Sequence, residues 1–342
     1  MTATTAGALT PADYVSAVAF DREARGLFAV GWIAVCRSEE VAGAGAQKAV
    51  MAATTPVLIV RLPNGAAAAL SNVCRHRALT LVEGETTGML VRCPYHLWAY
   101  GLDGKLEAAP FMDGVDLTGC DLPTYAAAEW GGWVFVNLDG KAEPLAALMA
   151  PLAADIGPER LAGWTVGFRL GFEHDWNWKV MVENFSESYH HIGAHRDTLQ
   201  PLWPGGQSDS SASTDRWIEL RHTDHPDAGT LNVFTVFPFF MLALSDPGES
   251  AFWYRMVPLG PERIALEIVG LFPPEVAEFT EAMEGAKAQI LAVHMEDIPM
   301  CERVQAGLRA PDAMLGPLSP LEAGLARFRA WASRAGRGDQ GA

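Results

Sequence analysis

Two short segments, each pairing a cysteine with a histidine, constrain this chain more than any other feature of its sequence. Cys74-x-His76 is followed by Cys93-x2-His96. Two thiolates and two imidazoles are the ligand set of a [2Fe-2S] cluster in which the cysteines hold one iron and the histidines hold the other. Neutral imidazoles leave less negative charge on the cluster than thiolates would, so it accepts an electron more readily. We therefore expect two hairpin tips that hold a one-electron carrier.

Zinc is the alternative metal for this motif, because tetrahedral zinc also binds two cysteines with two histidines. Zinc modules usually group like residues, as C-x2-C and H-x3-H, whereas each half of this motif carries one residue of each type. We therefore favour the iron–sulfur cluster. A visible absorption spectrum separates the two interpretations, since charge-transfer bands exclude zinc alone.

Composition restricts the compartment and the partners. The chain has 342 residues and five cysteines, and Cys36, Cys120 and Cys301 lie outside the motif without forming a disulfide pattern. Free thiolates favour a reducing compartment, so we expect a cytoplasmic protein. A formal net charge of −16 disfavours nucleic acid as a partner. The first residues lack a basic segment followed by an apolar one, and Pro238 interrupts the longest apolar run, so we expect no membrane span.

The order of strand and helix patterns predicts an α+β chain. Short strands and turns run from residue 49 to residue 138 and predict an all-β domain. Further on, several antiparallel strands precede a long helix at about 274–307, which predicts a sheet folded over a pocket. The expected boundaries are an N-terminal helical segment that packs on the second domain, the β domain, the second domain and a flexible tail, at residues 1–45, 46–150, 151–335 and 336–342.

A second group of metal-binding side chains lies in the C-terminal half. Helical periodicity places Glu183, Glu187 and His190 on one face, and Gly193 could end the helix so that His195 turns back. Two imidazoles with a carboxylate from elsewhere form the facial triad of non-haem Fe(II) oxygenases, which leaves coordination positions open for O2. Histidines on a helix are also typical of polar surface or hydrogen-bonded core. The cluster motif upstream favours the metal site.

Both regions resemble the Rieske non-haem iron oxygenases, in particular their terminal oxygenase α subunits. The resemblance runs through SNVCRHRALTL and VRCPYHLWAYGLDGKLEAAP, and it covers residues 21–331. The catalytic helix of the family reads N-x2-D/E-x2-H-x4-H, a pattern that Asn184, Glu187, His190 and His195 match. The resemblance implies an N-terminal Rieske domain, whose cluster is held by the ligands Cys74, His76, Cys93 and His96, and a C-terminal catalytic domain in which an antiparallel sheet and helices enclose a mononuclear Fe(II).

By the same resemblance, His190 and His195 bind this iron, and the third ligand comes from an acidic pair on a C-terminal helix. HMEDIPMCERVQAGL supplies such a pair, in which Asp297 matches the ligand and Glu296 is the alternative. An arbitrary acidic pair is more often a solvated turn. Asn184 and Glu187 are the implied catalytic residues outside the ligand set. The family's head-to-tail homotrimer implies that Glu187 bridges His190 to a Rieske histidine of the next subunit.

The implied activity is that of a mono- or dioxygenase, an oxidoreductase that hydroxylates or N-dealkylates a small organic substrate. Its implied partners are O2 and an NAD(P)H-dependent flavin or iron–sulfur reductase, with or without a ferredoxin. Glu187 and the surrounding ENFSESYH are similar to the branch that oxidises choline, glycine betaine or carnitine, although Arg196 stands where that branch commonly has proline. The alternatives are an arene dioxygenase or O-demethylase and a Rieske electron carrier, which needs only the β domain.

Aromatic residues of the second domain are candidates for the pocket wall. They are Phe234, Phe237, Phe239, Phe240, Trp253 and Tyr254. An aromatic cage stabilises a desolvated ammonium group, whereas the same rings would also line an arene pocket or form ordinary strand core. The sequence is compatible with all three roles.

Overall fold

The computed structural model describes residues 9–246 and 250–335, and these fall into two compact units. One unit comprises residues 29–162, and the other contains the described residues before 29 and after 162. The boundaries expected at 45/46 and 150/151 therefore differ from those observed. Strand β1 (Ile33–Arg37) pairs with β10 (Trp133–Asn137) in the first unit, which no local pattern reveals. The expected tail, 336–342, lies outside the described residues.

The first unit is built on antiparallel strands. A seven-stranded sheet has the order β1-β10-β9-β4-β3-β2-β5, and a three-stranded sheet has the order β6-β7-β8. The remaining bounds are β2 (Ala46–Ala52), β3 (Thr55–Arg61), β4 (Ala67–Ser71), β5 (Glu85–Thr87), β6 (Leu90–Arg92), β7 (Ala99–Gly101), β8 (Leu106–Ala108) and β9 (Thr124–Trp130). The short helices η1 (Ser38–Val41), α4 (Leu145–Met149), η2 (Ala150–Leu152), α5 (Ala153–Ile156) and α6 (Pro158–Ala162) complete it.

A glycine pair reverses the chain directly after Trp130. Gly131 and Gly132 have φ values of 59° and 84° and join β9 to β10. A Cβ on Gly132 would lie 2.5 Å from the Arg37 guanidinium, so this turn requires glycine for space as well as for backbone conformation.

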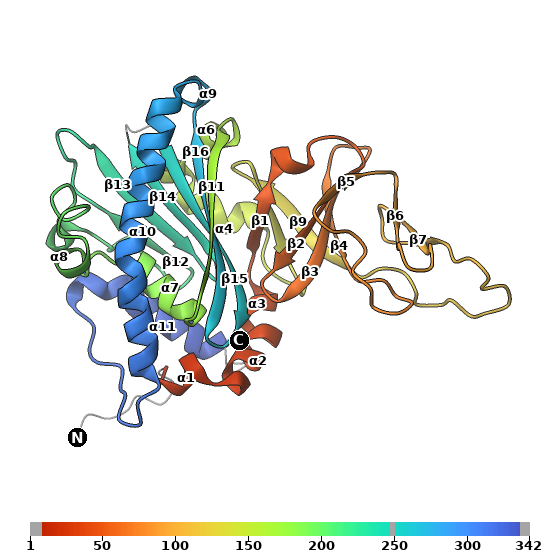
Figure 1. Cartoon of the computed structure of the whole chain (residues 1–342), viewed down its shortest axis with the longest axis horizontal. Helices are drawn as coiled ribbons and strands as arrows, with labels where there is room; N and C mark the ends of the chain where they lie inside the picture. Colours follow the sequence, from red (N-terminus) through yellow and green to blue (C-terminus); the bar gives the residue numbers. More distant parts are fainter. Residues whose placement is uncertain (1–8, 247–249, 336–342) are drawn as a thin grey trace. The chain divides into compact units, whose positions relative to one another are not determined.

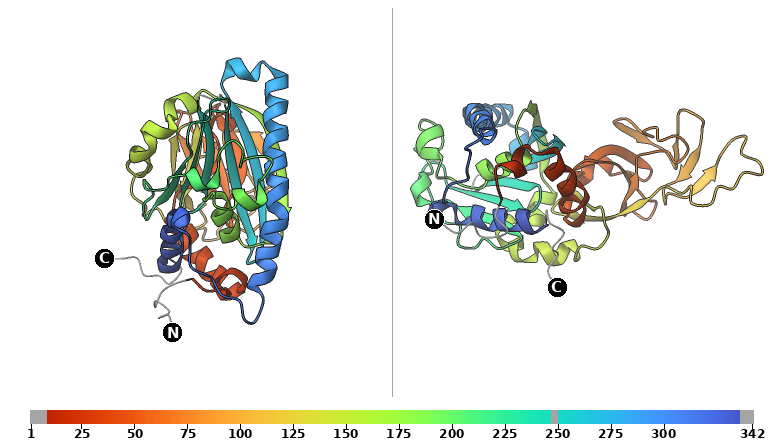
Figure 2. Two further views of the ribbon diagram at one scale, coloured as in Figure 1. Left: turned by 90° about the vertical axis from the view of Figure 1, so that its left-hand side faces the viewer. Right: turned by 90° about the horizontal axis from the view of Figure 1, so that it is seen from below.

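The second unit has a six-stranded antiparallel sheet in the order β11-β16-β15-β14-β13-β12. Its strands are β11 (Thr165–His174), β12 (Trp217–Arg221), β13 (Thr230–Val236), β14 (Phe240–Asp246), β15 (Ser250–Gly260) and β16 (Arg263–Phe272). The long helix α10 (Thr280–Leu308) runs along one face of this sheet (Figures 1 and 2). The observed α+β architecture confirms the predicted fold class. No described helix combines the length and the apolarity needed to cross a bilayer.

The other helices of this unit are short apart from α11. They are α1 (Ala12–Val15), α2 (Ala17–Arg25), α3 (Leu27–Val30, shared with the first unit), α7 (Trp178–Phe185), α8 (His191–Ala194), η3 (Gly205–Gln207), α9 (Pro274–Ala277), η4 (Pro320–Glu322) and α11 (Ala323–Ala335). The N-terminal helices α1 and α2 group with the second unit, whereas residues 29–45 of the segment expected to pack there belong to the first unit.

The single helix predicted across residues 183–190 is wrong. Helix α7 ends at Phe185, and the chain turns through residues 186–190 before the single turn of α8 begins. Glu183 therefore does not share a face with His190. Its carboxylate instead accepts from Arg329 Nε at 2.9 Å and from the Tyr14 hydroxyl at 2.5 Å.

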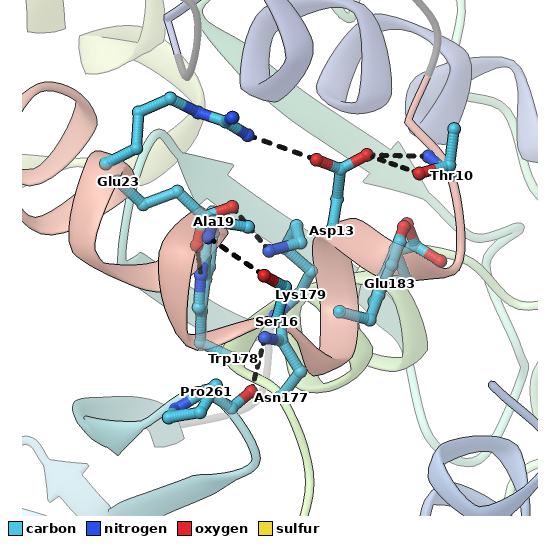
Figure 3. A network of polar contacts seen from close by, with 12 residues as sticks. Thr10, Asp13, Ser16, Ala19, Glu23, Asn177, Trp178, Lys179, Glu183 and Pro261 are labelled. Carbon is cyan, nitrogen blue, oxygen red and sulfur yellow. Dashed lines mark hydrogen bonds and ion pairs between the residues drawn. The ribbon is translucent and has the colours of Figure 1, made fainter. Parts of the chain in front are cut away.

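A buried polar network ties α2 to the start of α7 (Figure 3). Lys179 Nζ lies 2.6 Å from Glu23 Oε1, and Trp178 Nε1 donates to the other Glu23 oxygen at 2.8 Å. The side chains of Lys179 and Glu23 are 0% and 3% exposed. Burial lowers the pKa of Lys179, against which the Glu23 charge and hydrogen bond act. Removing either charge from such a pair leaves the other buried and uncompensated.

We expect Glu23→Ala to destabilise the second unit by about 3 kcal/mol, because the Lys179 ammonium and the Trp178 indole N–H would remain buried without this acceptor. Urea unfolding followed by tryptophan fluorescence measures this loss. The matched control is Glu173→Ala, which breaks an exposed pair with Arg263 and should cost much less. Equal losses for the two variants would contradict the role of the buried network.

Candidate functional site

The two cysteine–histidine loops of the first unit share one backbone pattern. In each loop the cysteine amide donates at 2.8 Å to the carbonyl of the residue five positions later, which is Leu79 for Cys74 and Trp98 for Cys93. The cysteine carbonyl in turn accepts at 3.0 Å from the amide four positions later, which is that of Ala78 or Leu97. The fourth residue after each cysteine has positive φ, 57° at Ala78 and 61° at Leu97. The backbone thus presents the two halves of the motif as matching tips, as the sequence predicts.

The loops bring the motif side chains close together. The rings of His76 and His96 have centroids 4.6 Å apart, and His76 stacks on Trp98 at 4.8 Å with 5° between the planes. Cys74 and Cys93 are buried beneath these rings in the same apolar cluster as Trp98. The arrangement places sulfur ligands inside and imidazole ligands towards the surface.

The surroundings of Cys74 favour the thiolate that iron requires. Burial raises the pKa of this thiol, but hydrogen bonds from the Tyr100 hydroxyl and from the His76 and Arg77 amides outweigh burial and lower it. Tyr100 lies 3.4 Å from the sulfur and its hydroxyl also accepts from the Arg75 amide at 3.1 Å. Donors that face a thiolate stabilise its charge, so these residues fit a cluster ligand.

In the second unit, His190, His195 and Asp297 bring one donor atom each to within 4.8 Å of one another. Asp297 Oδ1 lies 3.0 Å from His195 Nε2 and 3.7 Å from His190 Nε2. The buried His195 Nε2 has no partner with hydrogen-bond geometry among the described residues, although Asp297 is so close. Three donors aimed at a shared point, with one of them otherwise unpaired, suit the facial set of Fe(II).

Carboxylates hold the far side of each imidazole. His190 Nδ1 lies 2.7 Å from Glu187 Oε1, and His195 Nδ1 lies 2.7 Å from Glu296 Oε2. Because an ionised carboxylate only accepts, each Nδ1 carries a proton, which leaves each Nε2 as the ring atom available to a metal. Glu187 also accepts from the His190 amide at 3.2 Å.

The acidic pair on α10 therefore divides its roles between adjacent residues. Asp297 joins the donor group, whereas Glu296 binds His195 from outside and accepts from the Thr198 hydroxyl at 2.6 Å. Asn184 donates to Asp297 Oδ1 at 3.0 Å. Burial raises the pKa of Asp297, but the contacts with His195, His190 and Asn184 outweigh burial and lower it. The sequence did not predict the contact of Glu296 with His195. The family pattern for the third ligand is an acidic pair, and it assigns no separate role to the other acid.

A cavity of about 140 Å³ adjoins this group, close to the size that accommodates benzene. Its floor is a row of side chains that pair across four strands, Leu220 with Val233, Val233 with Ala243, and Ala243 with Phe252. Phe185 packs on this row from α7. The sheet alternation thus presents small and large apolar groups to one side of the metal-binding residues.

The expectation about aromatic residues is correct for one of the six. Tyr254 lines the cavity, whereas Phe234, Phe240 and Trp253 alternate to the opposite sheet face. Phe237 and Phe239 pack elsewhere, Phe237 against Phe328 and Phe239 against Trp178. The other aromatic walls are Phe185, Phe252 and Trp203.

The described lining of the cavity contains no lysine or arginine. Its acidic side chains are Glu187 and Asp297, which both adjoin the histidines. A substrate carboxylate would therefore lack a cationic partner there. A compact cation would contact aromatic rings and lie near the carboxylates of Glu187 and Asp297, and both are favourable surroundings for an ammonium group.

Comparisons with known proteins agree with this geometry. Residues 31–126 match the Rieske [2Fe-2S] domain, and residues 161–336, more than half of the chain, match the ring hydroxylating alpha subunit (catalytic domain). The chain belongs to the ring-hydroxylating alpha subunits of the Rieske oxygenases. It therefore carries a Rieske [2Fe-2S] cluster and a mononuclear iron, and its class is that of the non-haem iron mono- and dioxygenases.

Several relatives of this Rieske oxygenase have assigned activities. Choline monooxygenase of Atriplex hortensis is 26% identical over 352 residues, which cover 95% of this chain and 77% of the relative. Putrescine 2-hydroxylase of Ralstonia nicotianae is 26% identical over 307 residues, 81% of each chain. The glycine betaine monooxygenase oxygenase subunit of Chromohalobacter salexigens is 30% identical over 206 residues, 59% of this chain; this match spans less than half of the relative, 46%.

Solved structures share the fold. The quaternary ammonium Rieske monooxygenase CntA in complex with L-carnitine superposes with a TM-score of 0.83 at 23% identity, covering 96% of this chain and 95% of that one. A naphthalene 1,2-dioxygenase superposes with a TM-score of 0.78 at 16% identity, covering 95% and 92%. Since enzymes of different substrate classes share this architecture, the fold alone does not select a substrate.

We expect the purified oxygenase to hold about three irons and about two acid-labile sulfides per chain. His76→Ala should remove the sulfide and the Rieske absorption while one iron per chain still binds, because the proposed mononuclear ligands lie in the other unit. Iron and sulfide assays with visible spectra test this. Loss of the Rieske spectrum in His190→Ala would instead show that the two sites are not independent.

Proposed function

We propose that this Rieske oxygenase is the terminal component of a system that oxidises a small amine or methylated ammonium compound by hydroxylation or N-dealkylation. The proposed partners are O2 and an NAD(P)H-dependent flavin or iron–sulfur reductase, directly or through a ferredoxin. The main support is the pair of histidines with Asp297 beside an aromatic cavity that has no cationic side chain among its described residues. The names of the relatives, which include choline, carnitine and putrescine enzymes, agree with an amine class.

In this proposal, the motif residues Cys74, His76, Cys93 and His96 hold the cluster, and His190, His195 and Asp297 hold the iron. The cluster supplies single electrons and the ferrous iron supplies O2 activation. Glu187 and Glu296 fix the orientation and the tautomer of the two histidines through their Nδ1 atoms. Asn184 fixes Asp297 through its amide.

The cavity residues orient the substrate. Phe185 and Tyr254, whose centroids lie 4.7 Å apart, offer ring faces to a cationic carbon–nitrogen centre, and Phe252 extends the wall from β15. The apolar floor excludes water from the reacting groups. The small volume favours compact substrates over fused aromatic rings.

Oxygen uptake over a matched substrate panel tests this function. With a surrogate reductase, we expect uptake coupled to product with small amines and methylated ammonium compounds, and little with fused-ring arenes. The control omits the reductase and should abolish uptake with every compound. Uptake restricted to arenes would reject the amine proposal in favour of arene oxidation.

If Asp297 is the iron ligand, substitutions of Asp297 and of its neighbour Glu296 should have different effects on iron binding. Asp297→Ala should lose mononuclear iron and product formation while it keeps the Rieske spectrum. Glu296→Gln should keep the ligand set but weaken Fe(II) binding about 10- to 100-fold, because His195 loses a charged acceptor. Fe(II) titration of iron-depleted protein measures both. The opposite pattern, with iron lost in Glu296→Gln and kept in Asp297→Ala, would assign the ligand to Glu296.

We also propose a homotrimer in which Glu187 connects His190 to a Rieske histidine of the next subunit. One Glu187 oxygen is 2.7 Å from His190 Nδ1, and each carboxylate oxygen can accept more than one donor. Glu187→Gln should keep the iron content and the reducible cluster but lose most turnover. Light scattering tests the trimer, and single-turnover kinetics of pre-reduced protein test the connection. Cluster oxidation at the wild-type rate in Glu187→Gln would contradict it.

A further inference from the structure

Two histidines that line the cavity each have a buried ring nitrogen without a hydrogen-bond partner among the described residues. One is His195 Nε2, which the proposed iron site explains. The other is His222 Nε2, in a residue that follows β12 and is 6% exposed. Buried polar side-chain atoms are nearly always paired, so an unpaired one beside a cavity indicates an absent ligand or water. No step of the proposed reaction uses His222.

Hydrogen bonding fixes which nitrogen of His222 carries the proton. Nδ1 lies 2.8 Å from the Leu231 carbonyl oxygen on the neighbouring strand. A carbonyl only accepts, so Nδ1 is the N–H donor. Burial lowers the pKa of His222, which keeps the ring neutral. The remaining nitrogen, Nε2, therefore has a lone pair and needs a donor.

The position of His222 relates this acceptor to the iron site. Ring centroids are 5.5 Å apart between His195 and His191, and again 5.5 Å apart between His191 and His222. His191 itself is fixed by Nδ1, which lies 2.9 Å from the Trp203 carbonyl oxygen. The His191 ring is thus 5.5 Å both from His222 and from the proposed iron ligand His195. A small molecule can span this separation, with one end at His222 and a carbon near the proposed iron site.

We propose that His222 Nε2 accepts a hydrogen bond from an N–H or O–H group of the substrate and makes this cavity selective for compounds that carry such a donor. This inference rests on the proposed function of the cavity as the substrate pocket. Within the amine class it favours primary, secondary and tertiary ammonium ions over quaternary ones. A neutral acceptor does not repel a cation, and the described lining adds no positive side chain that would.

Matched ligand pairs test the inference by binding alone. One pair is ethyldimethylammonium, which has an N–H, and ethyltrimethylammonium, which has none. The other is phenol, which has an O–H, and anisole, which has none. Isothermal titration calorimetry under anaerobic conditions without reductase measures affinity independently of turnover. The wild-type chain should bind the donor member of at least one pair about 10- to 100-fold more tightly than its methylated partner.

Two variants separate the hydrogen bond from the shape of the ring. The amide nitrogen of His222→Asn can replace Nδ1 and keep the Leu231 bond, but nothing replaces Nε2. The side chain of His222→Gln is long enough to place an amide oxygen near the Nε2 position. His222→Asn should lose about 10- to 100-fold in affinity for the donor ligand and change less than about threefold for its partner, whereas His222→Gln should keep part of the preference. Melting temperatures and Rieske spectra confirm that both variants fold.

The outcomes also separate this inference from the proposed function. Preference for phenol over anisole without ammonium binding would reject the amine function and keep the role of His222. Equal binding within both pairs, binding of no probe, or a preference that persists in His222→Asn would each overturn the inference, since Nε2 would then serve only a bound water. Preference for ethyldimethylammonium that disappears in His222→Asn supports both proposals.

Discussion

The geometry of the site depends on one short stretch of α10, where consecutive acids contact the same imidazole from opposite sides. Asp297 approaches His195 Nε2 at 3.0 Å, and Glu296 approaches Nδ1 at 2.7 Å. Glu296 holds the ring through Nδ1, so rotation of the ring would break this contact and turn Nε2 away from Asp297. His190 is anchored by Glu187 in the same way, but from its own loop. Helix α10 therefore fixes the position of His195, and the loop that carries His195 needs only to bring it within reach of these two acids.

The second unit also relies on polar contacts that are remote from the metal-binding residues. Glu23 and Lys179 fix the beginning of α7, and Glu183 joins its end to Arg329 of α11. These contacts hold the helix that carries Asn184 towards Asp297. Removal of one partner from such a contact leaves the other charge without compensation in a poorly solvated position, which is costly. Stability and placement of the site are thus linked through α7.

The sequence predicted the chemistry of the chain better than its local geometry. The cysteine–histidine motif was recognisable because cluster ligands require particular side chains at short separations, whereas Asp297 was expected only from the resemblance to a known family. The end of α7 at Phe185 was missed because Glu183, Glu187 and His190 keep a helical spacing beyond it. The pocket aromatics were misjudged because a shift of one residue in a strand moves every side chain to the other face. The pairing of β1 with β10 is likewise non-local.

The cavity floor suggests how enzymes with this fold can change their substrate preference. Leu220, Val233, Ala243 and Phe252 come from four different strands, whereas the metal-binding residues come from loops and from α10. A change at Ala243 would alter the space above the sheet without moving any backbone that carries His190 or Asp297. New preferences can therefore arise one side chain at a time while oxygen chemistry is retained, which makes the sheet face the natural target for directed evolution.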